Sequence, residues 1–178
     1  MSHVVIDTNV LLVANRNHEG ASDECVLNCV EELKKIREHG VVVVDDDWKI
    51  LHEYQNKTHP NQPKGVGDVF LKWLLQNKNN TQHVAQVTIT EIRKDTFREF
   101  PVTDLQSQFD PPDRKFAAVA NAHDNKPMIL QAADCKWLDW WPQLLSSGIE
   151  VKFLCRDDVC QFYKKKFPKK SHPKLPDE

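Results

Sequence analysis

Four acidic residues in separate segments have the strongest potential for chemistry. They are Asp7, Glu53, Asp113 and Asp134. Carboxylates that meet at one edge of a sheet repel one another unless divalent cations neutralise them. Hard oxygen ligands select Mg²⁺ or Mn²⁺, and these ions activate water and stabilise phosphodiester oxygens. The set therefore predicts a centre for divalent ions that supports hydrolysis, provided that the fold brings the four together.

The segment around Asp113 is the most informative local pattern. Proline favours the first helical position, so Pro111 predicts a helix with Asp110 as its N-cap and Asp113 in the first turn. Asp113 lies three residues before Phe116 and so shares the buried face of that helix. A charge at the head of a buried face needs a partner or a metal ion. We therefore assign Asp110 to capping and Asp113 to the metal centre.

The other acids at strand ends have a simpler explanation. Asp45, Asp46 and Asp47 follow the buried run at residues 41–44, and a helix N-terminus attracts acids through its dipole. We interpret them as caps. Asp7 and Asp134 could also be N-caps, so their assignment to a metal centre depends on the whole set of four.

Apolar periodicity predicts strands that alternate with helices. The expected strands cover residues 3–6, 41–44, 84–89, 128–130 and 151–154. The expected helices cover residues 10–13, 22–39, 45–54, 66–76, 111–123, 134–145 and 157–166, with Ser22 as an N-cap and Gly40 and Gly148 as stops. Residues 90–110 have no clear pattern. This alternation predicts a single-domain α/β/α sandwich with a mostly parallel sheet, and sites in such sheets form beyond the carboxyl ends of the strands.

Composition limits the function classes. The 178 residues suit one domain, which we place at residues 1–163, followed by a loose basic tail rich in Pro and Lys at 164–178. The tail has six lysines and two acids, which give it a charge of +4. Because the net charge of the chain is −2, residues 1–163 carry a charge of −6. An acidic body needs metal ions or local basic patches to bind a polyanion. No apolar run is long enough to span a membrane, and neither G-x-G-x-x-G nor a P-loop motif is present.

The cysteines and histidines give weaker signals. The five cysteines are an odd number without C-x-x-C spacing, which predicts free thiols and a cytoplasmic location. Cys25 and Cys29 share a helix face, but zinc needs two more ligands, so we expect core cysteines. None of the eight histidines forms an H-x-x-x-H motif, and His52 and His123 are expected on helix surfaces.

The spacing of these acids resembles that of the PIN-domain family of metal-dependent nucleases. The resemblance covers nearly all of residues 1–155, and it depends on the Val4–Asn9 strand that ends in Asp-Thr-Asn, on Glu53, on the Asp113–Ala120 run and on Asp134. It implies a PIN-like fold in which the four acids are catalytic and hold one or two Mg²⁺ or Mn²⁺ ions. It also implies endonucleolytic hydrolysis of RNA, most readily single-stranded RNA, by a toxin or an RNA-processing enzyme. A protein inhibitor or antitoxin, and a homo-oligomer, are open as partners.

Residues near the acids are candidates for binding the substrate. They are Asn9, Arg114, Lys115 and Lys136, with the basic tail as a further candidate. The chain departs from the family pattern at Ala132, where many relatives have a hydroxyl, and at Lys136, where many have a further acid. The rim of the centre thus has one hydroxyl and one carboxylate fewer.

Three alternatives stay open. The departures at Ala132 and Lys136 are compatible with a PIN-like binding module that has lost catalysis. A phosphatase of the haloacid-dehalogenase type also begins with a strand and an acid, but Asn9 stands where a second acid is needed. A phospho-acceptor receiver domain is suggested by Val41–Val44 and the three acids after it, but such domains begin with that strand.

Overall fold

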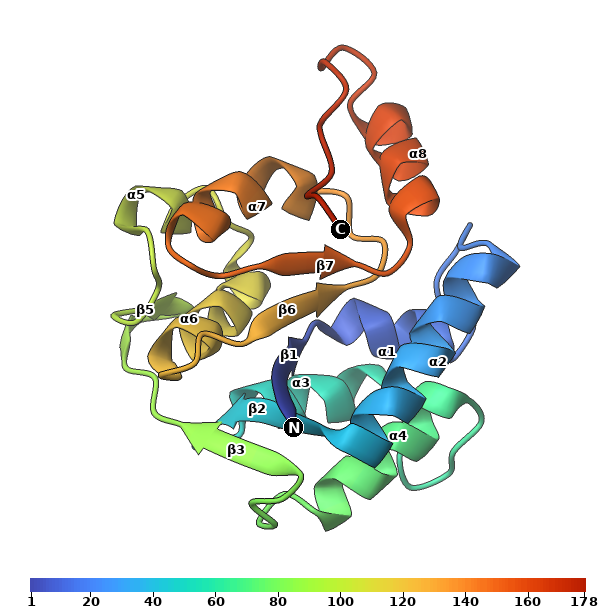
Figure 1. Ribbon diagram of the computed structural model, residues 1–178, viewed down its shortest axis with the longest axis vertical. Helices are drawn as coiled ribbons and strands as arrows, with labels where there is room; N and C mark the ends of the chain where they lie inside the picture. The colour runs from blue at the N-terminus through green and yellow to red at the C-terminus, as the bar shows by residue number, and fades with distance from the viewer.

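The computed structural model describes all 178 residues and contains a central sheet of five parallel strands (Figure 1). The strands are β1 (Ser2–Ile6), β2 (Gly40–Asp45), β3 (Val84–Val87), β6 (Met128–Gln131) and β7 (Val151–Phe153). Their order in the sheet is β3-β2-β1-β6-β7, and every neighbouring pair is parallel. All five strands lie where the hydrophobic pattern predicts them, so the predicted α/β class with a parallel sheet is confirmed.

Eight α-helices connect and cover the strands. They are α1 (Thr8–Ala14), α2 (Asp23–His39), α3 (Lys49–Lys57), α4 (Val66–Gln76), α5 (Thr103–Gln106), α6 (Arg114–Ala122), α7 (Trp137–Ser146) and α8 (Arg156–Lys166). Figure 1 shows α1, α2 and α4 grouped on one side of the sheet and α5, α6 and α7 on the other. A cluster of 48 buried residues joins both groups of helices to the sheet. No helix combines the length and the apolar character needed to cross a membrane.

Strand β2 illustrates how the sequence specifies this core. All six of its residues are buried, which a strand covered by helices on both faces requires. Asp45 ends the strand, and its carboxylate accepts hydrogen bonds from the backbone N–H groups of Lys49 (2.8 Å) and Ile50 (3.0 Å). The interpretation of this acid as a cap is therefore confirmed. Ser22 is confirmed in the same way, because its hydroxyl accepts from the backbone N–H of Cys25 at 3.1 Å.

One of the two predictions about glycine stops needs correction. Gly40 does not end a helix in the left-handed conformation: its φ is −108°, and it is the first residue of β2. Glycine is needed there for space, because a Cβ would lie 3.0 Å from the Cα of Ile36. Gly148 does have the left-handed φ of +83° that its role as a stop predicts.

Residues 90–110 are more ordered than their sequence predicts. They contain a short antiparallel hairpin, β4 (Glu91–Arg93) and β5 (Thr96–Phe97), and helix α5. The side chain of Gln106 accepts from the backbone N–H of Phe97 (2.8 Å) and donates to its carbonyl (3.2 Å). The amide of Gln106 thus satisfies the backbone groups of Phe97, which a third strand would otherwise pair. Hydrophobic periodicity cannot predict a contact of this kind.

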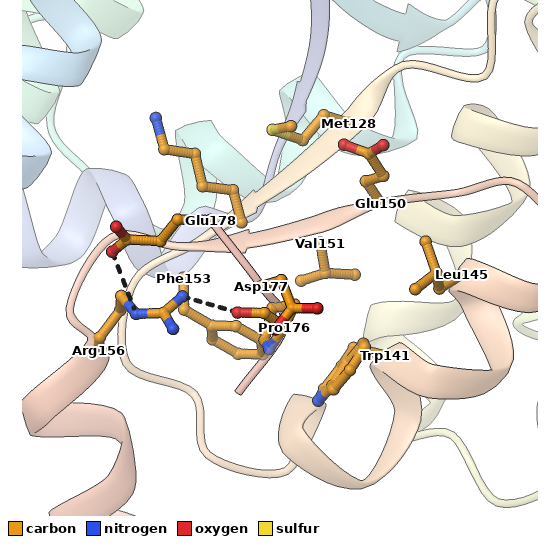
Figure 2. A pocket seen from close by; sticks show the side chains of 11 residues that line it. Met128, Trp141, Leu145, Glu150, Val151, Phe153, Arg156, Pro176, Asp177 and Glu178 are labelled. Carbon is orange, nitrogen blue, oxygen red and sulfur yellow. Dashed lines mark hydrogen bonds and ion pairs between the residues drawn. The ribbon is translucent and has the colours of Figure 1, made fainter. Parts of the chain in front are cut away.

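The C-terminal segment is not the loose tail that its composition predicts. Residues 164–166 belong to α8, and the remaining residues return to the body beside β7 (Figure 1). There Arg156 donates to the carbonyl of Pro176 at 3.0 Å and pairs with Glu178 at 3.6 Å, and the indole of Trp141 donates to the carbonyl of Lys174 at 3.0 Å. The tail thereby walls a cavity of about 670 Å³ (Figure 2).

The prediction that all five cysteines are free thiols is wrong for two of them. Cys25 in α2 and Cys155, which directly precedes α8, form a disulfide that joins positions 130 residues apart. Cys29, Cys135 and Cys160 are free. An odd count and the absence of C-x-x-C spacing could not reveal this pair, because only the packing of α2 against the β7–α8 junction brings the two sulfur atoms together.

Candidate metal centre

The order of the strands reverses around β1, and the candidate centre lies there. The chain continues from β1 to β2 on one side, whereas β6 lies on the other side of β1. Ligand sites of open parallel sheets form beyond the carboxyl ends of the strands at such a switch point. Asp7 directly follows β1, and Asp134 lies three residues after the end of β6. The two acids therefore lie on the two connections that border this crevice.

Asp7 combines the two roles that its sequence position allows. Its Oδ1 accepts from the backbone N–H of Asn9 at 2.8 Å and so caps α1. Its Oδ2 is buried and has no hydrogen-bond partner. A buried carboxylate oxygen without a partner is unfavourable unless a cation or a proton satisfies it. One oxygen of Asp7 therefore serves the fold, and the other is available to a ligand.

Glu53 reaches the same crevice from α3. Its Oε1 accepts from the hydroxyl of Thr8 at 2.5 Å, and its Oε2 forms an ion pair with the ammonium group of Lys115. Lys115 is buried and also donates to the carbonyl of Pro112. The carboxylate of Glu53 is therefore held in a fixed orientation and neutralised by a lysine from α6.

Asp113 and Asp134 complete the group, and their pKa values show that the four acids act on one another. Burial, together with the charges of Asp134, Asp110 and Glu53, raises the pKa of Asp113 to about 7, and Lys115 opposes this rise. Burial also raises the pKa of Asp7 well above its usual range, and Asp113, Asp134 and Glu53 add to that effect. The structure thus brings the four predicted acids into one electrostatic group.

Asp134 is less perturbed because positive groups surround it. Burial raises its pKa, whereas the backbone N–H of Lys136, at 3.2 Å from Oδ1, and the side chains of Lys136 and Lys166 lower it. Asp134 is not the N-cap residue of α7, which begins at Trp137, but its Oδ1 and its carbonyl accept backbone N–H groups of the turn that leads into this helix. Asp134, like Asp7, therefore combines a local backbone contact with its place in the acid group.

The group of acids is open rather than tight. No three of these carboxylates place ligand oxygens within 4.8 Å of one another. Cys25, Cys29 and Cys155 do lie this close together, but they are in a different part of the protein. Mutual repulsion and the pairing of Glu53 with Lys115 both favour such separation. The donors are nevertheless all carboxylate oxygens and include the unpartnered Oδ2 of Asp7, so these residues fit a hard divalent cation.

Asn9 positions the loop that carries Asp134. Its side-chain Oδ1 accepts from the backbone N–H of Ala133 at 2.8 Å, which links α1 to the β6–α7 loop across 124 residues. This contact assigns Asn9 a positioning role. Its predicted contact with the substrate stays a prediction.

The structure changes the interpretation of Asp110. No side-chain hydrogen bond from Asp110 caps the 3-10 turn that follows it. Asp110 forms an ion pair with Lys136 instead. Asp110 occupies the N-cap position, but the prediction that its side chain caps the turn is wrong, because Pro111 and Pro112 have no N–H group and the N–H of Asp113 bonds the carbonyl of Asp110.

Arg114 is tied into the fold. Its guanidinium donates to the carbonyls of Phe109 (3.1 Å) and Asp95 (3.2 Å) and to the hydroxyl of Thr96 (3.2 Å). These bonds anchor the β4–β5 hairpin to the start of α6. Lys115 and Lys136 are also paired, each with an acid. All three basic residues that were predicted to bind the substrate therefore have a partner within the protein.

Basic residues that sequence reasoning did not place here lie beside the acids. A cavity of about 550 Å³ is lined by Asn9, His18, Ala133, Asp134, Cys135, Phe162, Lys165 and Lys166. The exposed lysines come from α8 and lie near Asp134 only in the folded chain. The larger cavity beside the tail (Figure 2) contains none of the four acids. His123 is likewise remote from the centre, since it packs on His3 at the start of β1 with ring centroids 4.8 Å apart.

Comparison with protein-family models, with curated proteins and with solved structures finds no match to this chain. The functional assignment therefore depends on the residues and the geometry described above.

Proposed function

We propose that the protein is a metal-dependent endoribonuclease and that Asp7, Glu53, Asp113 and Asp134 form its metal centre. The observation that carries the proposal is the unpartnered, buried Oδ2 of Asp7 inside a group of mutually repelling carboxylates. Such a group is electrostatically unfavourable by itself and becomes favourable when a divalent cation binds. A bound Mg²⁺ or Mn²⁺ would supply an activated water molecule and stabilise phosphodiester oxygens.

The chain's own residues then divide the remaining work. Asp7, Asp113 and Asp134 would hold the cation, and Thr8 keeps one oxygen of Glu53 oriented through its 2.5 Å hydrogen bond. Asn9 fixes the loop that carries Asp134.

The lysines of α8 would attract the polyanionic substrate. Lys165 and Lys166 line the cavity that borders Asp134, and they are exposed. Neither forms an ion pair with an acid of the chain, so both are available to phosphate groups. This arrangement explains how a body with a net negative charge could bind RNA through one local basic surface next to the metal centre.

The test is cleavage of end-labelled single-stranded RNA and DNA by the full chain, with Mn²⁺, with Mg²⁺ and with a chelator. We expect cleavage of RNA that depends on the metal and is lost in Asp7→Asn. Asparagine keeps the oxygen that caps α1, so this variant removes the charge and spares the cap. Asp124→Asn is the matched control, because Asp124 is exposed and remote from the group. Cleavage that survives the chelator, or that Asp7→Asn retains in full, would contradict the proposal.

A second candidate function is RNA binding without catalysis at the same surface. It is favoured by the ion pairs of Lys115 with Glu53 and of Lys136 with Asp110, which neutralise one acid of the group and one neighbouring acid without any metal. The same experiment separates the two candidates. A binding module retains RNA in a gel-shift assay with the chelator present and leaves the RNA intact in Mn²⁺.

A further inference from the structure

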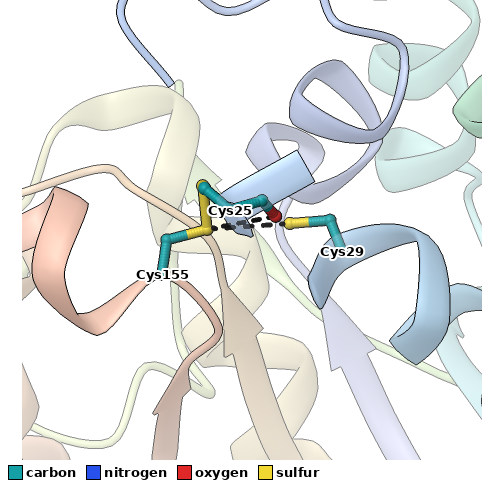
Figure 3. Close-up of side chains that lie close together, drawn as sticks. All are labelled: Cys25, Cys29 and Cys155. Carbon is teal, nitrogen blue, oxygen red and sulfur yellow. Dashed lines mark hydrogen bonds between the residues drawn. A yellow bond between two sulfur atoms is a disulfide. The ribbon is translucent and has the colours of Figure 1, made fainter. Parts of the chain in front are cut away.

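Three cysteine sulfur atoms meet in the core between α2 and the β7–α8 junction. The sulfur atoms of Cys25, Cys29 and Cys155 all lie within 4.8 Å of one another, and the three residues are buried (Figure 3). Cys25 and Cys155 form the disulfide, and Cys29 Sγ lies 3.9 Å from Cys155 Sγ. Cys25 and Cys29 are one helical turn apart on α2 and so project from the same face. A structural disulfide needs only two of these three side chains.

The cluster borders a cavity with an acidic lining. This cavity has a volume of about 370 Å³, and Cys25, Cys155, Glu24, Asp157 and Asp158 are among the residues that line it. The carboxylate of Asp158 is held in place by the backbone N–H (2.7 Å) and the hydroxyl (2.8 Å) of Ser22. Acids around an opening to buried sulfur atoms attract cations. The cavity thus gives the cluster an entry path and room for an oxygen ligand.

We propose that the reduced protein binds one Zn²⁺ ion through the thiolates of Cys25, Cys29 and Cys155, with a water molecule or Asp158 as the fourth ligand. Zn–S bonds of about 2.3 Å place the sulfur atoms of a tetrahedral site about 3.8 Å apart. The separation of Cys29 and Cys155 already matches this value. Completing the site requires the sulfur atoms of Cys25 and Cys155 to move apart once their bond is reduced, while all three sulfur atoms already lie within 4.8 Å of one another.

The conversion from the disulfide to the zinc site is chemically balanced. An external dithiol donates two electrons and two protons to the Cys25–Cys155 bond, which becomes two thiols, while the dithiol becomes a disulfide. Zinc then displaces the protons of all three thiols into the solvent. The site exists only in the reduced protein, because the disulfide removes two of its three thiolates.

The surroundings explain why a metal ion is needed to deprotonate the cluster. Burial, together with the charges of Asp158 and Glu32, raises the pKa of Cys29 to about 12. Cys25 lies in the first turn of α2 and Cys155 directly precedes α8, where helix dipoles favour thiolates. Three neighbouring thiolates are nevertheless strongly repulsive without a cation. Zinc binding should therefore release protons and weaken as the pH falls.

Cobalt titration of the reduced, chelator-treated full chain tests the proposal. Co²⁺ in the cysteine cluster gives an intense sulfur-to-cobalt charge-transfer absorption, whereas Co²⁺ bound by carboxylates does not, so the two centres are distinguished in one spectrum. We expect this absorption to reach its maximum at one equivalent and to disappear when Zn²⁺ displaces the cobalt. The oxidised protein should not give it. This result does not depend on whether the protein is a nuclease.

Cys29→Ser is the decisive variant, and Cys160→Ser is its matched control. Loss of a ligand should weaken Co²⁺ binding by more than about 100-fold, the upper end of the effect of losing an outer-shell partner. Cys29→Ser keeps the disulfide pair, so thermal melting of the oxidised variant verifies that it folds, and Cys29→Ala provides a second version. Absence of the sulfur absorption in the reduced protein, or equal affinity in Cys29→Ser and the unmodified chain, would overturn the proposal.

Discussion

The acid group and the cysteine cluster are both assembled from distant segments, but they differ in how their charges are managed. The acids keep their carboxylates apart, and Lys115 pairs with Glu53 inside the group. The cysteines are in contact, and two of them are joined by a bond. Buried carboxylates that repel one another need a counter-charge or a proton, whereas thiols stay neutral when buried and can pack closely. The distance between side chains is therefore a poor criterion for comparing a candidate metal site made of carboxylates with one made of thiols.

The largest expected effect concerns Asp113. If it binds metal, Asp113→Asn should reduce RNA cleavage in Mn²⁺ by orders of magnitude, since the ion contributes several kcal/mol to transition-state stabilisation. The same variant should be more stable than the unmodified chain without metal, because one of the repelling charges is gone. Cleavage assays and thermal melting measure the two effects.

Asp110→Asn is the control for Asp113. It removes a partly exposed ion pair with Lys136, which is worth about 0–1 kcal/mol, and should leave most of the cleavage activity. Equal activity of Asp113→Asn and the unmodified chain would favour the non-catalytic binding module.

The second effect tests the disulfide. Cys155→Ser should destabilise the oxidised protein by about 2–5 kcal/mol, because the bond restricts a long loop in the unfolded chain. Cys25→Ser should be less harmful, since Cys29 lies 3.9 Å from Cys155 and can take the place of Cys25 in a disulfide. Urea denaturation under non-reducing conditions gives both values. Equal destabilisation by the two variants would show that Cys29 cannot reach Cys155.

The third effect is a pH dependence of the acid group. The pKa of Asp113 is about 7 in the folded protein, above the ordinary aspartate value of 3.8, so the folded state binds the proton more tightly than the unfolded state. Its contribution to stability is therefore complete below about pH 4 and is lost as the pH rises through about 7. The melting temperature of the metal-free protein should fall between about pH 4 and about pH 7.

Mn²⁺ provides the control for this pH dependence. The ion competes with protons for the carboxylates, so saturating Mn²⁺ should stabilise the protein more at the upper end of this range. A melting temperature that Mn²⁺ leaves unchanged throughout the range would contradict metal binding by the acids.

The smallest effect concerns α8. Replacing Lys165 and Lys166 with Gln should weaken RNA binding and lower the slope of log affinity against log salt by about 1 for each lost phosphate contact. The matched control replaces Lys169 and Lys174 in the segment after α8, which carries the same charge but does not line the cavity beside Asp134. Equal losses in both double variants would show that only net charge matters. Fluorescence anisotropy at several salt concentrations measures the slopes.

Most of the fold could be predicted from the sequence because its signals are local. A strand buried on both faces needs an apolar run such as Val41–Val44, and Asp7 stands at the end of such a run. The hairpin at residues 91–97 was missed because its strands are short, and the first is exposed and lacks alternation. The ion pair of Asp110 was missed because Lys136 is remote in sequence.

The sequence by itself determined which acids follow or flank the strands, and hence the four carboxylates of the candidate centre. Only the tertiary structure decided their partners: Thr8 and Lys115 on Glu53, and the lysines of α8 beside Asp134. The disulfide and its third thiol were likewise decided by the packing of α2 against the β7–α8 junction. The physical reason is that backbone preferences and hydrophobic periodicity act over a few residues, whereas ion pairs and sulfur contacts form between segments that meet only after the sheet has assembled.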